Sequence, residues 1–424
     1  MSVHSGINLD EESQKSIYYL QLCYYLSFEA GVVDMQAYLA KRELVFLCVS
    51  SFFVMMGMGV VAPILPQYAL TFGVSYTVAG LTISAFAIAR IFINSPAGMM
   101  VGRVGRKKTI LVGMILVGFG TLFCGLSQNI YQLIIFRIVH GAGSAFFILA
   151  ANVMVTDLAP INERAKYLSY FQATFRFGAV LGPAFGGFLA ELIDMRAPFF
   201  ALSVFSLVGF ALSLTLIKES QCVGNVARPT EIKTFFYILF DKRFLLVMLI
   251  QMISMLTTSG IRSTMIPIYG VKYASLSVTD IGLILSIGAL FSLPFLLLIS
   301  NYVDRIGRRP PLTVGLGLVG FGVLYFVLTK DFLGILTGIL IMSLGQVLLN
   351  PSKVALVADY AKEEDIGIAY GVFRTAGDVG MFLGPILSGA LLDRAGVVWP
   401  FFATSSLCWV TTAITFFRLK ENQK

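Results

Sequence analysis

The sequence predicts an all-α membrane protein of two similar halves, and three observations lead to that fold class. Of its 424 residues, 57% are hydrophobic and only 13% are charged, whereas a soluble domain carries roughly 25% charged residues. Apolar runs of about 20 residues, the length that crosses the hydrocarbon core of a bilayer, recur twelve times along the chain. The chain also repeats itself at an offset of 202 residues, so that Arg103–Arg106 (Arg-Val-Gly-Arg) returns as Arg305–Arg308 (Arg-Ile-Gly-Arg).

The twelve apolar runs predict transmembrane helices, because only helices satisfy every backbone group inside lipid when the alternation typical of barrel strands is absent. The predicted spans are 44–69, 76–101, 109–127, 130–156, 166–190, 198–217, 243–269, 279–303, 312–329, 332–357, 368–391 and 398–418. They form two six-helix pseudo-symmetric bundles, 43–217 and 243–424, joined by a polar cytoplasmic linker at 218–242. Residues 1–42 are predicted to be a cytoplasmic segment that is either an amphipathic surface helix or dispensable.

The 202-residue repeat continues without a gap over more than a hundred residues. It pairs Gly80 with Gly282, Ser84 with Ser286, Asp157 with Asp359, Phe171 with Phe373 and Gly187 with Gly389. It also pairs Gly178, Gly182 and Pro183 with Gly380, Gly384 and Pro385. Two apolar halves of equal length indicate duplicated bundles, an architecture typical of secondary transporters.

Basic residues are distributed unevenly between the two sides of the predicted membrane protein. The loops on one side carry fifteen Lys and Arg residues, and those on the other carry four, namely Arg196, Lys272, Lys330 and Arg394. The positive-inside rule makes the richer side cytoplasmic and predicts both chain termini there. We therefore read the net charge of +8 as a sign of topology. The expected location is the plasma membrane, or the inner membrane of a Gram-negative bacterium.

Three segments carry motifs with a physical reason for their composition. The loop from Gly98 to Lys108 combines glycines that permit a sharp turn with cations that hold the turn in the cytoplasm. The fourth span contains a deep Arg137 followed by His140. The fifth span carries glycines four residues apart and an internal proline, which together give a flat, bent helix face for close packing. The alternative is a packing seam without a mechanistic role.

These segments resemble three signatures of the major facilitator superfamily: the loop motif after helix two, the helix-four arginine motif and the helix-five glycine-proline motif. The resemblance covers the chain from residue 44 to its end, and the last motif marks drug–proton exporters in that family. It implies a helix-packing set of Gly178, Gly182, Pro183, Gly186, Gly187, Gly380, Gly384 and Pro385. It also implies a cytoplasmic gating set of Gly102, Arg103, Gly105, Arg106, Asp157, Asp304, Arg305, Gly307, Arg308, Asp359 and Arg374.

The chain departs from the family pattern at two places. Gly102 stands where the family usually has an aspartate; the second half keeps it as Asp304, although Ser300 replaces the glycine that matches Gly98. By resemblance, this aspartate pairs with a cation and a helix N-terminus across the bundles, so the latch of the first half is expected to be weaker. The segment Met58–Pro66 also lacks the acidic residue that many of these exporters carry in helix one.

Ionisable groups at membrane depth are costly and are functional candidates by default. The predicted spans contain Arg90, Arg137, His140, Arg176, Arg262, Lys353, Arg374 and a single deep acid, Asp378. Asp378 lies roughly 15 Å into its span and Arg90 roughly 18 Å from Gly102, at 1.5 Å per residue, so these two side chains can pair. Arg374, one turn from Asp378, is the alternative partner. Lys353 and Arg374 lie near the cytoplasmic edge and are expected to snorkel toward it.

The roles of these groups follow partly from the resemblance and partly from their charge. Asp378 either binds a proton in one state or only neutralises a buried cation. By resemblance Arg137 takes part in proton coupling, while His140 is expected to be a satisfied helix contact. Arg176 is expected to face the same cavity as Asp378, and Arg262 to lie near the external mouth. Four deep arginines against one acid leave the cavity positive, which fits an anionic or zwitterionic substrate.

The sequence therefore predicts a monomeric exporter of small amphipathic organic compounds that works by proton antiport. One alternative is a facilitator or symporter for an organic anion or metabolite, and another is a non-transporting sensor or lipid-handling scaffold. An enzyme is not expected, because the sequence shows no nucleophile–base grouping, phosphate loop or metal-ligand spacing. The expected partners are the substrate, protons and the lipid bilayer, without a cofactor, a metal or a nucleic acid.

Overall fold

The computed structural model describes residues 42–160, 163–219, 237–362 and 365–419, apart from the side chains of residues 165, 296–298 and 300–305. Most of the predicted N-terminal segment and of the linker lies outside the described residues, as do the side chains of Asp304 and Arg305. The described part of the chain is helical without a strand, and twelve of its helices are long and apolar enough to cross a membrane. The predicted all-α membrane fold is confirmed.

The twelve helices follow the predicted apolar runs in order. The first half contains Arg42–Val61, α3 (Tyr76–Arg103), α4 (Arg106–Gly125), α5 (Ile130–Leu158), α6 (Arg164–Leu192) and α7 (Ala197–Leu216). The second half contains a composite helix that begins with α9 (Lys242–Thr257), then α11 (Val278–Ile306), α12 (Arg309–Tyr325), α13 (Phe332–Tyr360), α14 (Ile366–Ala395) and α15 (Trp399–Arg418). Gly105 (φ 110°) and Gly307 (φ 85°) make the sharp turns of the two basic loops, in a backbone region that suits glycine.

Two spans are interrupted where a continuous helix was expected. The first helix ends at Val61, a turn follows, and the short α2 (Leu65–Leu70) completes the crossing. Pro63 and Pro66 cause this break, because neither has the backbone N–H that a regular helix requires. In the seventh span, α9 passes into a π-helical segment, η2 (Thr258–Met265), before α10 (Ile266–Tyr273). Such π-helical turns occur frequently at functional sites.

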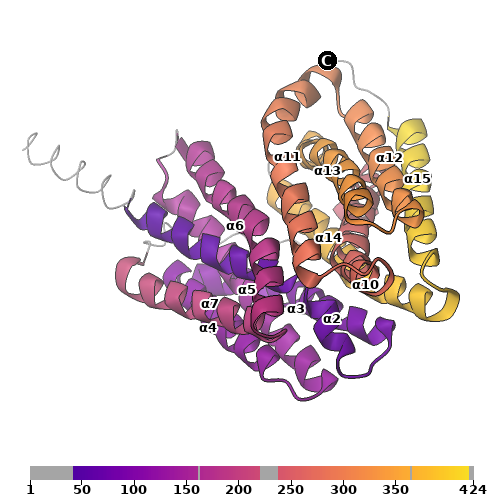
Figure 1. The fold of residues 1–424 in the computed structure, drawn as a ribbon. Coiled ribbons are helices and arrows are strands. Elements are labelled where there is room, and N and C mark those ends of the chain that lie inside the picture. Colours follow the sequence, from indigo (N-terminus) through magenta and orange to yellow (C-terminus); the bar gives the residue numbers. More distant parts are fainter. Residues whose placement is uncertain (1–41, 161–162, 220–236, 363–364, 420–424) are drawn as a thin grey trace, which may run out of the picture.

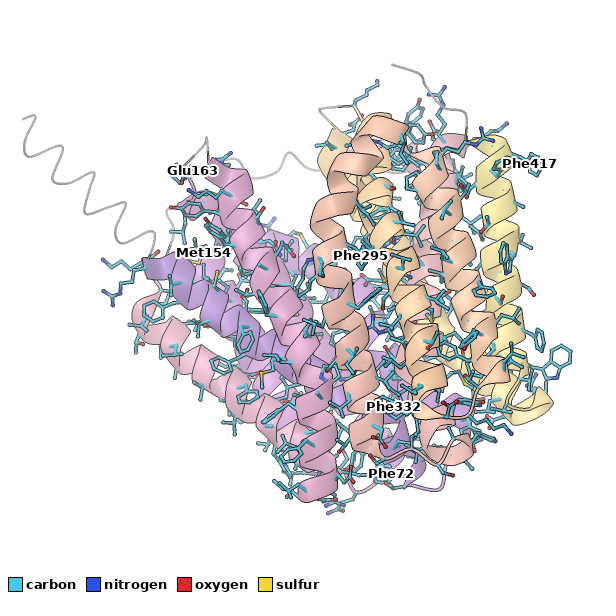
Figure 2. The ribbon with its side chains drawn as sticks, turned by 45° about the horizontal axis from the view of Figure 1, so that its top comes forward. Phe72, Met154, Glu163, Phe295, Phe332 and Phe417 are labelled. Carbon is cyan, nitrogen blue, oxygen red and sulfur yellow. The ribbon has the colours of Figure 1, made fainter. Side chains whose placement is uncertain are left out.

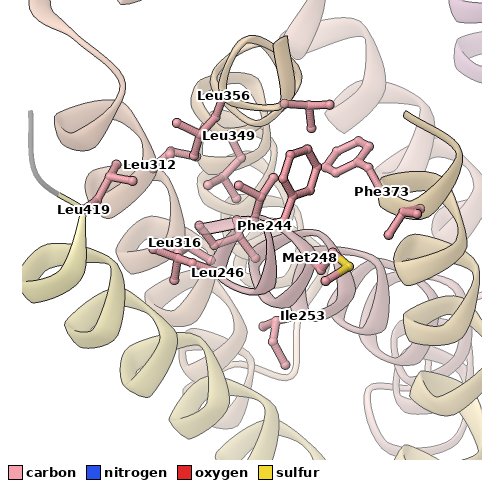
Figure 3. Packing of buried hydrophobic residues seen from close by; sticks show 14 of the residues in the cluster. Phe244, Leu246, Met248, Ile253, Leu312, Leu316, Leu349, Leu356, Phe373 and Leu419 are labelled. Carbon is pink, nitrogen blue, oxygen red and sulfur yellow. The ribbon is translucent and has the colours of Figure 1, made fainter. Parts of the chain in front are cut away.

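Each half contains its own apolar core. In the second half, Phe244 and Ile253 on α9 pack with Leu316 on α12, Leu349 on α13 and Phe373 on α14 (Figure 3). In the first half, Leu47 of the first helix and Met114 on α4 join residues such as Phe147 on α5 and Phe171 on α6. Because interiors are close-packed and resist local deformation, each half is expected to move as a unit.

The two halves meet mainly through two helix pairs, α3 with α14 and α6 with α11. In Figure 2 the halves separate toward the end that carries Glu163 and approach each other toward the end of Phe72 and Phe332. Figure 1 shows the same arrangement, with the indigo-to-magenta half spreading away from the orange-to-yellow half. We call the end with the loops Arg103–Lys108 and Gly307–Arg309 the basic-loop end, and the opposite end the closed end.

Candidate functional site at the interface of the two halves

Glycines allow one helix of each half to approach a neighbouring helix so closely that the two backbones are in contact. A Cβ atom on Gly178 of α6 would lie 2.7 Å from the backbone nitrogen of Met56 in the first helix. A Cβ on Gly384 of α14 would lie 2.6 Å from Ser259 Oγ and 2.9 Å from the backbone nitrogen of Gly260, both in η2. All three distances are too short for a real side chain. The predicted close approach of helices is therefore present in both halves.

The prolines of the two motifs contact the opposite half. The carbonyl oxygen of Pro183 on α6 occupies the place of a side chain on Gly282 of α11, and that of Pro385 on α14 does the same for Gly80 of α3. Ser286 Oγ of α11 accepts a hydrogen bond of 2.9 Å from the backbone nitrogen of Ala184. The residues that the 202-residue offset pairs thus build two matching interfaces between the halves.

A carboxylate at the closed end caps a helix of the opposite half. Asp393 of α14 accepts hydrogen bonds from the backbone nitrogens of Tyr76 (3.0 Å) and Thr77 (2.8 Å) at the start of α3, and from Thr77 Oγ1 (2.6 Å). The residue 202 positions before Asp393, Glu191 of α6, lies beside Thr279 at the start of α11. Neither acid was predicted as a contact between the halves, although an acid at 191 and 393 and a threonine at 77 and 279 are visible at the offset.

At the basic-loop end, glycines on the two helices α3 and α14 face open space. A Cβ on Gly102 of α3, or on Gly367 or Gly371 of α14, would have no atom of the described residues within 4 Å. The loop arginines instead form ion pairs inside their own halves, Arg106 with Asp157 (Nε–Oδ2 2.8 Å) and Arg308 with Asp359 (3.2 Å). The structure is thus open at the basic-loop end, and Arg103 is exposed there.

The Arg90–Asp378 pair, which residue counting from the helix ends predicted, is present at the α3–α14 interface. Arg90 Nη2 lies 3.3 Å from Asp378 Oδ1, and the two side chains are only 11% and 4% exposed. Asn94, one turn along α3, donates from Nδ2 to Asp378 Oδ2 at 3.0 Å, and its role was not foreseen. Arg374 makes no ion pair with Asp378, so Arg90 is the partner among the described residues. Both oxygens of the deep acid are bound across the two halves.

Arg137 and His140 line a cavity of about 120 Å³ between the halves. Its walls are Met58, Val61, Ala62, Leu65, Ile83, Phe86, Arg137 and His140 from the first half and Ser263 from η2. The Arg137 guanidinium donates to the carbonyl oxygen of Thr82 (3.3 Å), stands 5.1 Å from the Phe86 ring centroid and lies 2.8 Å from His140 Nδ1. No described carboxylate lies within ion-pair distance of Arg137.

The contact with Arg137 fixes the tautomer of His140. A guanidinium can only donate, so Nδ1 of His140 accepts and the ring hydrogen sits on Nε2. That Nε2 is buried and has no hydrogen-bond partner among the described residues. His140 was expected to be a satisfied helix contact, and its unpaired Nε2 contradicts that expectation. The cavity is therefore lined by a guanidinium without a described carboxylate partner, an arrangement suited to an anionic group.

Three other predicted cations occupy different surroundings. Arg176 is exposed on α6, whereas Asp378 is buried, and no hydrogen bond or ion pair joins them. Arg262, in the π-helical segment, donates from Nη2 to the carbonyl oxygen of Leu285 on α11 at 3.1 Å. The predicted snorkelling of Lys353 is wrong, because its side chain is only 2% exposed and its Nζ donates to Ser254 Oγ on α9 at 2.9 Å.

Two pseudo-symmetric six-helix halves, closed at one end around a polar centre and open at the other, define a membrane transporter and not an enzyme. The chain belongs to the Major Facilitator Superfamily, whose model matches residues 47–277 and 247–424. Multidrug resistance protein 1 of Bacillus subtilis is 27% identical over 366 residues, which cover 86% of this chain and 93% of that protein. The quinolone resistance protein NorA of Staphylococcus aureus (strain COL) is 24% identical over 367 residues, 83% of this chain and 90% of NorA.

The fold is also similar to that of solved transporters. A bacterial homolog of the human lysosomal transporter Spinster, in an inward-facing and unoccupied conformation, superposes with a TM-score of 0.76 at 16% identity. The match covers 89% of this chain and 96% of that chain. At this identity the likeness shows the fold alone.

Proposed function

We propose that this chain is a secondary active exporter of small amphipathic organic compounds with an anionic group, driven by proton antiport. The observation that carries the proposal is the Arg137–His140 cavity, which is lined by a buried guanidinium without a described carboxylate partner. A carboxylate on the substrate would supply the missing negative charge. Relatives named for multidrug and quinolone resistance support the direction and the substrate size.

The orientation in the membrane belongs to the same proposal. The excess of Lys and Arg at the basic-loop end supports a cytoplasmic location for that end and for both termini. The state described here then receives substrate from the cytoplasm, and the contacts at the closed end separate when the substrate leaves on the other side. The protein acts as a monomer, since the cavity lies between two halves of one chain.

Asp378 has one of two roles in this cycle. Either it exchanges a proton when the bridge to Arg90 and Asn94 opens, or it serves only as the counter-ion that lets Arg90 lie at the interface. A facilitator or symporter for an organic anion is the second candidate function, because the positive cavity fits such a substrate equally well. Proton movement separates the two functions.

The test uses purified protein in liposomes with an internal pH dye and a zwitterionic fluoroquinolone as the probe. An imposed pH gradient should drive quinolone transport with opposite proton movement, and Arg137→Gln should abolish it. The matched control is Arg394→Gln, which removes an exposed arginine at the closed end. Quinolone movement without proton movement would favour the facilitator. An Arg137→Gln variant as active as the control would remove the cavity from the proposal.

A further inference from the structure

Lys353 is the buried group that the interface mechanism leaves unused. It lies on α13 inside the second half, and its Nζ donates to Ser254 Oγ of α9 at 2.9 Å. Ser254 Oγ in turn donates to Gln346 Oε1 of α13 at 3.1 Å. The result is a polar chain of Lys353, Ser254 and Gln346 in the apolar interior of a bundle. No described carboxylate lies within ion-pair distance of Nζ.

Two side-chain atoms on these helices are buried without a partner. Gln346 Nε2, and Oε1 of Gln251, which lies one turn before Ser254 on α9, have no hydrogen-bond partner among the described residues. Unpaired buried polar atoms destabilise a fold, so such a cluster calls for an explanation beyond packing. The described ionisable groups on the surrounding helices include Arg374 and Asp378 of α14, Arg309 of α12 and Arg243 of α9, and none of these bonds to Lys353.

The duplicated half shows that the scaffold does not need the lysine. At the position 202 residues before Lys353, the first half has Ala151, which is fully buried, as a core residue should be. At the position that matches Gln346, it has Ser144, whose buried Oγ also lacks a hydrogen-bond partner among the described residues. Both halves thus carry buried polar groups here, whereas the buried cation is specific to the second half, which favours a function over a structural need.

The ligand that fits this site is a proton. A side chain that is 2% exposed presents no surface to a larger ligand. An ammonium group in an apolar interior without an anion is strongly disfavoured, and the neutral amine is the form that such burial favours. Lys353 also lies seven residues before Tyr360, the end of α13 at the basic-loop end. That separation is about 10 Å at 1.5 Å per residue, a short path to water.

We propose that Lys353 is a proton-binding site of the second half, which releases its proton toward the basic-loop end in the state described here. The step breaks one N–H bond: the ammonium becomes a neutral amine, and the proton passes to water. In the opposite state the amine takes up a proton from water that enters between the two halves at the closed end. The inference rests on the proposed antiport, and it assigns proton exchange to a group other than the bridged Asp378.

The first test needs no substrate. In full-length protein without native cysteines, Gly371→Cys reports the open basic-loop end, because a side chain there has free space. Its maleimide labelling is divided by that of Thr215→Cys, an exposed site whose reactivity corrects for thiol ionisation. The ratio should rise with pH, by up to about tenfold per pH unit, the limit for one proton. Lys353→Met should remove this dependence, whereas Lys330→Met, an exposed control, should keep it.

The second test compares two modes of fluoroquinolone transport in liposomes. Lys353→Met should lose transport driven by a pH gradient and keep quinolone exchange at equal pH, whereas a merely structural role would lower both. If Lys353→Met does not fold, Ser254→Ala removes the acceptor of Nζ and should shift the pH midpoint of labelling. A pH dependence that persists in Lys353→Met, or a midpoint that stays unchanged in Ser254→Ala, overturns the inference. Failure of the proposed function would instead appear as absent proton-driven transport in the unmodified protein.

Discussion

The carboxylate cap at the closed end gives a direct test of how the two halves are held together. Asp393 accepts three hydrogen bonds at the start of α3, which belongs to the other half. Replacing a helix cap by alanine costs about 1 kcal/mol when the site is solvated, as this exposed site is. These bonds exist only while the closed end is shut. Asp393→Ala should therefore destabilise that state by the same free energy and shift the population toward the state in which this end is open. A change of about 1 kcal/mol corresponds to roughly fivefold in that equilibrium.

The assay is labelling of a cysteine that the closed interface buries. Ser84→Cys is suitable, since Ser84 is fully buried and its Oγ donates to the carbonyl oxygen of Phe382 across the interface. In the Asp393→Ala background its labelling rate should rise about fivefold, in line with the population shift. The matched control is Asp331→Ala, because Asp331 caps its own helix α13 by accepting from the Gly334 nitrogen at 3.3 Å.

The control distinguishes the loss of a contact between the two halves from the loss of a helix cap within one half. Asp331→Ala should lower the stability of the second half without raising the labelling of the Ser84→Cys reporter, because its bond lies within one half. Glu191→Ala should change the labelling in the same direction as Asp393→Ala, since Glu191 lies beside Thr279 at the start of α11 across the interface. Equal labelling rates in Asp393→Ala and in the protein that retains Asp393 would refute the view that the Asp393 cap holds the closed end.

Three other changes have defined outcomes. Gly182→Leu should cost at least 1–3 kcal/mol of stability, measured as thermal unfolding in detergent, because the added atoms would overlap the Met56 carbonyl oxygen; a normal midpoint would contradict the packing role. Gly102→Asp should favour closure of the basic-loop end, since the site has free space and the carboxylate restores the family latch; unchanged labelling of the Gly371→Cys reporter would oppose this. Asp378→Asn should lower stability by roughly 3 kcal/mol, because it leaves Arg90 buried without its counter-ion. Transport driven by a pH gradient that survives Asp378→Asn would exclude a coupling role for this acid.

Features that depend on one helix or on the repeat were predictable from the sequence. Hydropathy located all twelve spans, because the length and apolarity of a membrane helix are set by the bilayer. Counting residues from the helix ends placed Arg90 and Asp378 at matching depths, since the rise per residue of a helix is fixed. The glycine-proline motifs gave the closely packed faces, because the absence of a side chain is itself visible in the sequence.

Features that depend on the direction of a side chain were not predictable. Lys353 was expected to snorkel because its distance from the helix end allows it, yet the packing of α13 against α9 turns it inward to Ser254. The unused Nε2 of His140 depends on the nearby guanidinium of Arg137. The break after Val61 and the π-helical turn in the seventh span likewise change helix geometry without interrupting the apolar run.

The sequence alone determined that this chain is a duplicated twelve-helix membrane protein with transporter motifs. The bilayer imposes length and apolarity on each helix, and a duplication produces matching residues at a constant offset. The spans and the repeat are therefore both visible in the sequence. The tertiary structure decided which symmetric positions meet across the halves, which end is open, and that the lysine cluster lies inside the second half. These features depend on how the helices are packed. Because the same sequence adopts both states of the transport cycle, the sequence cannot indicate which end is open.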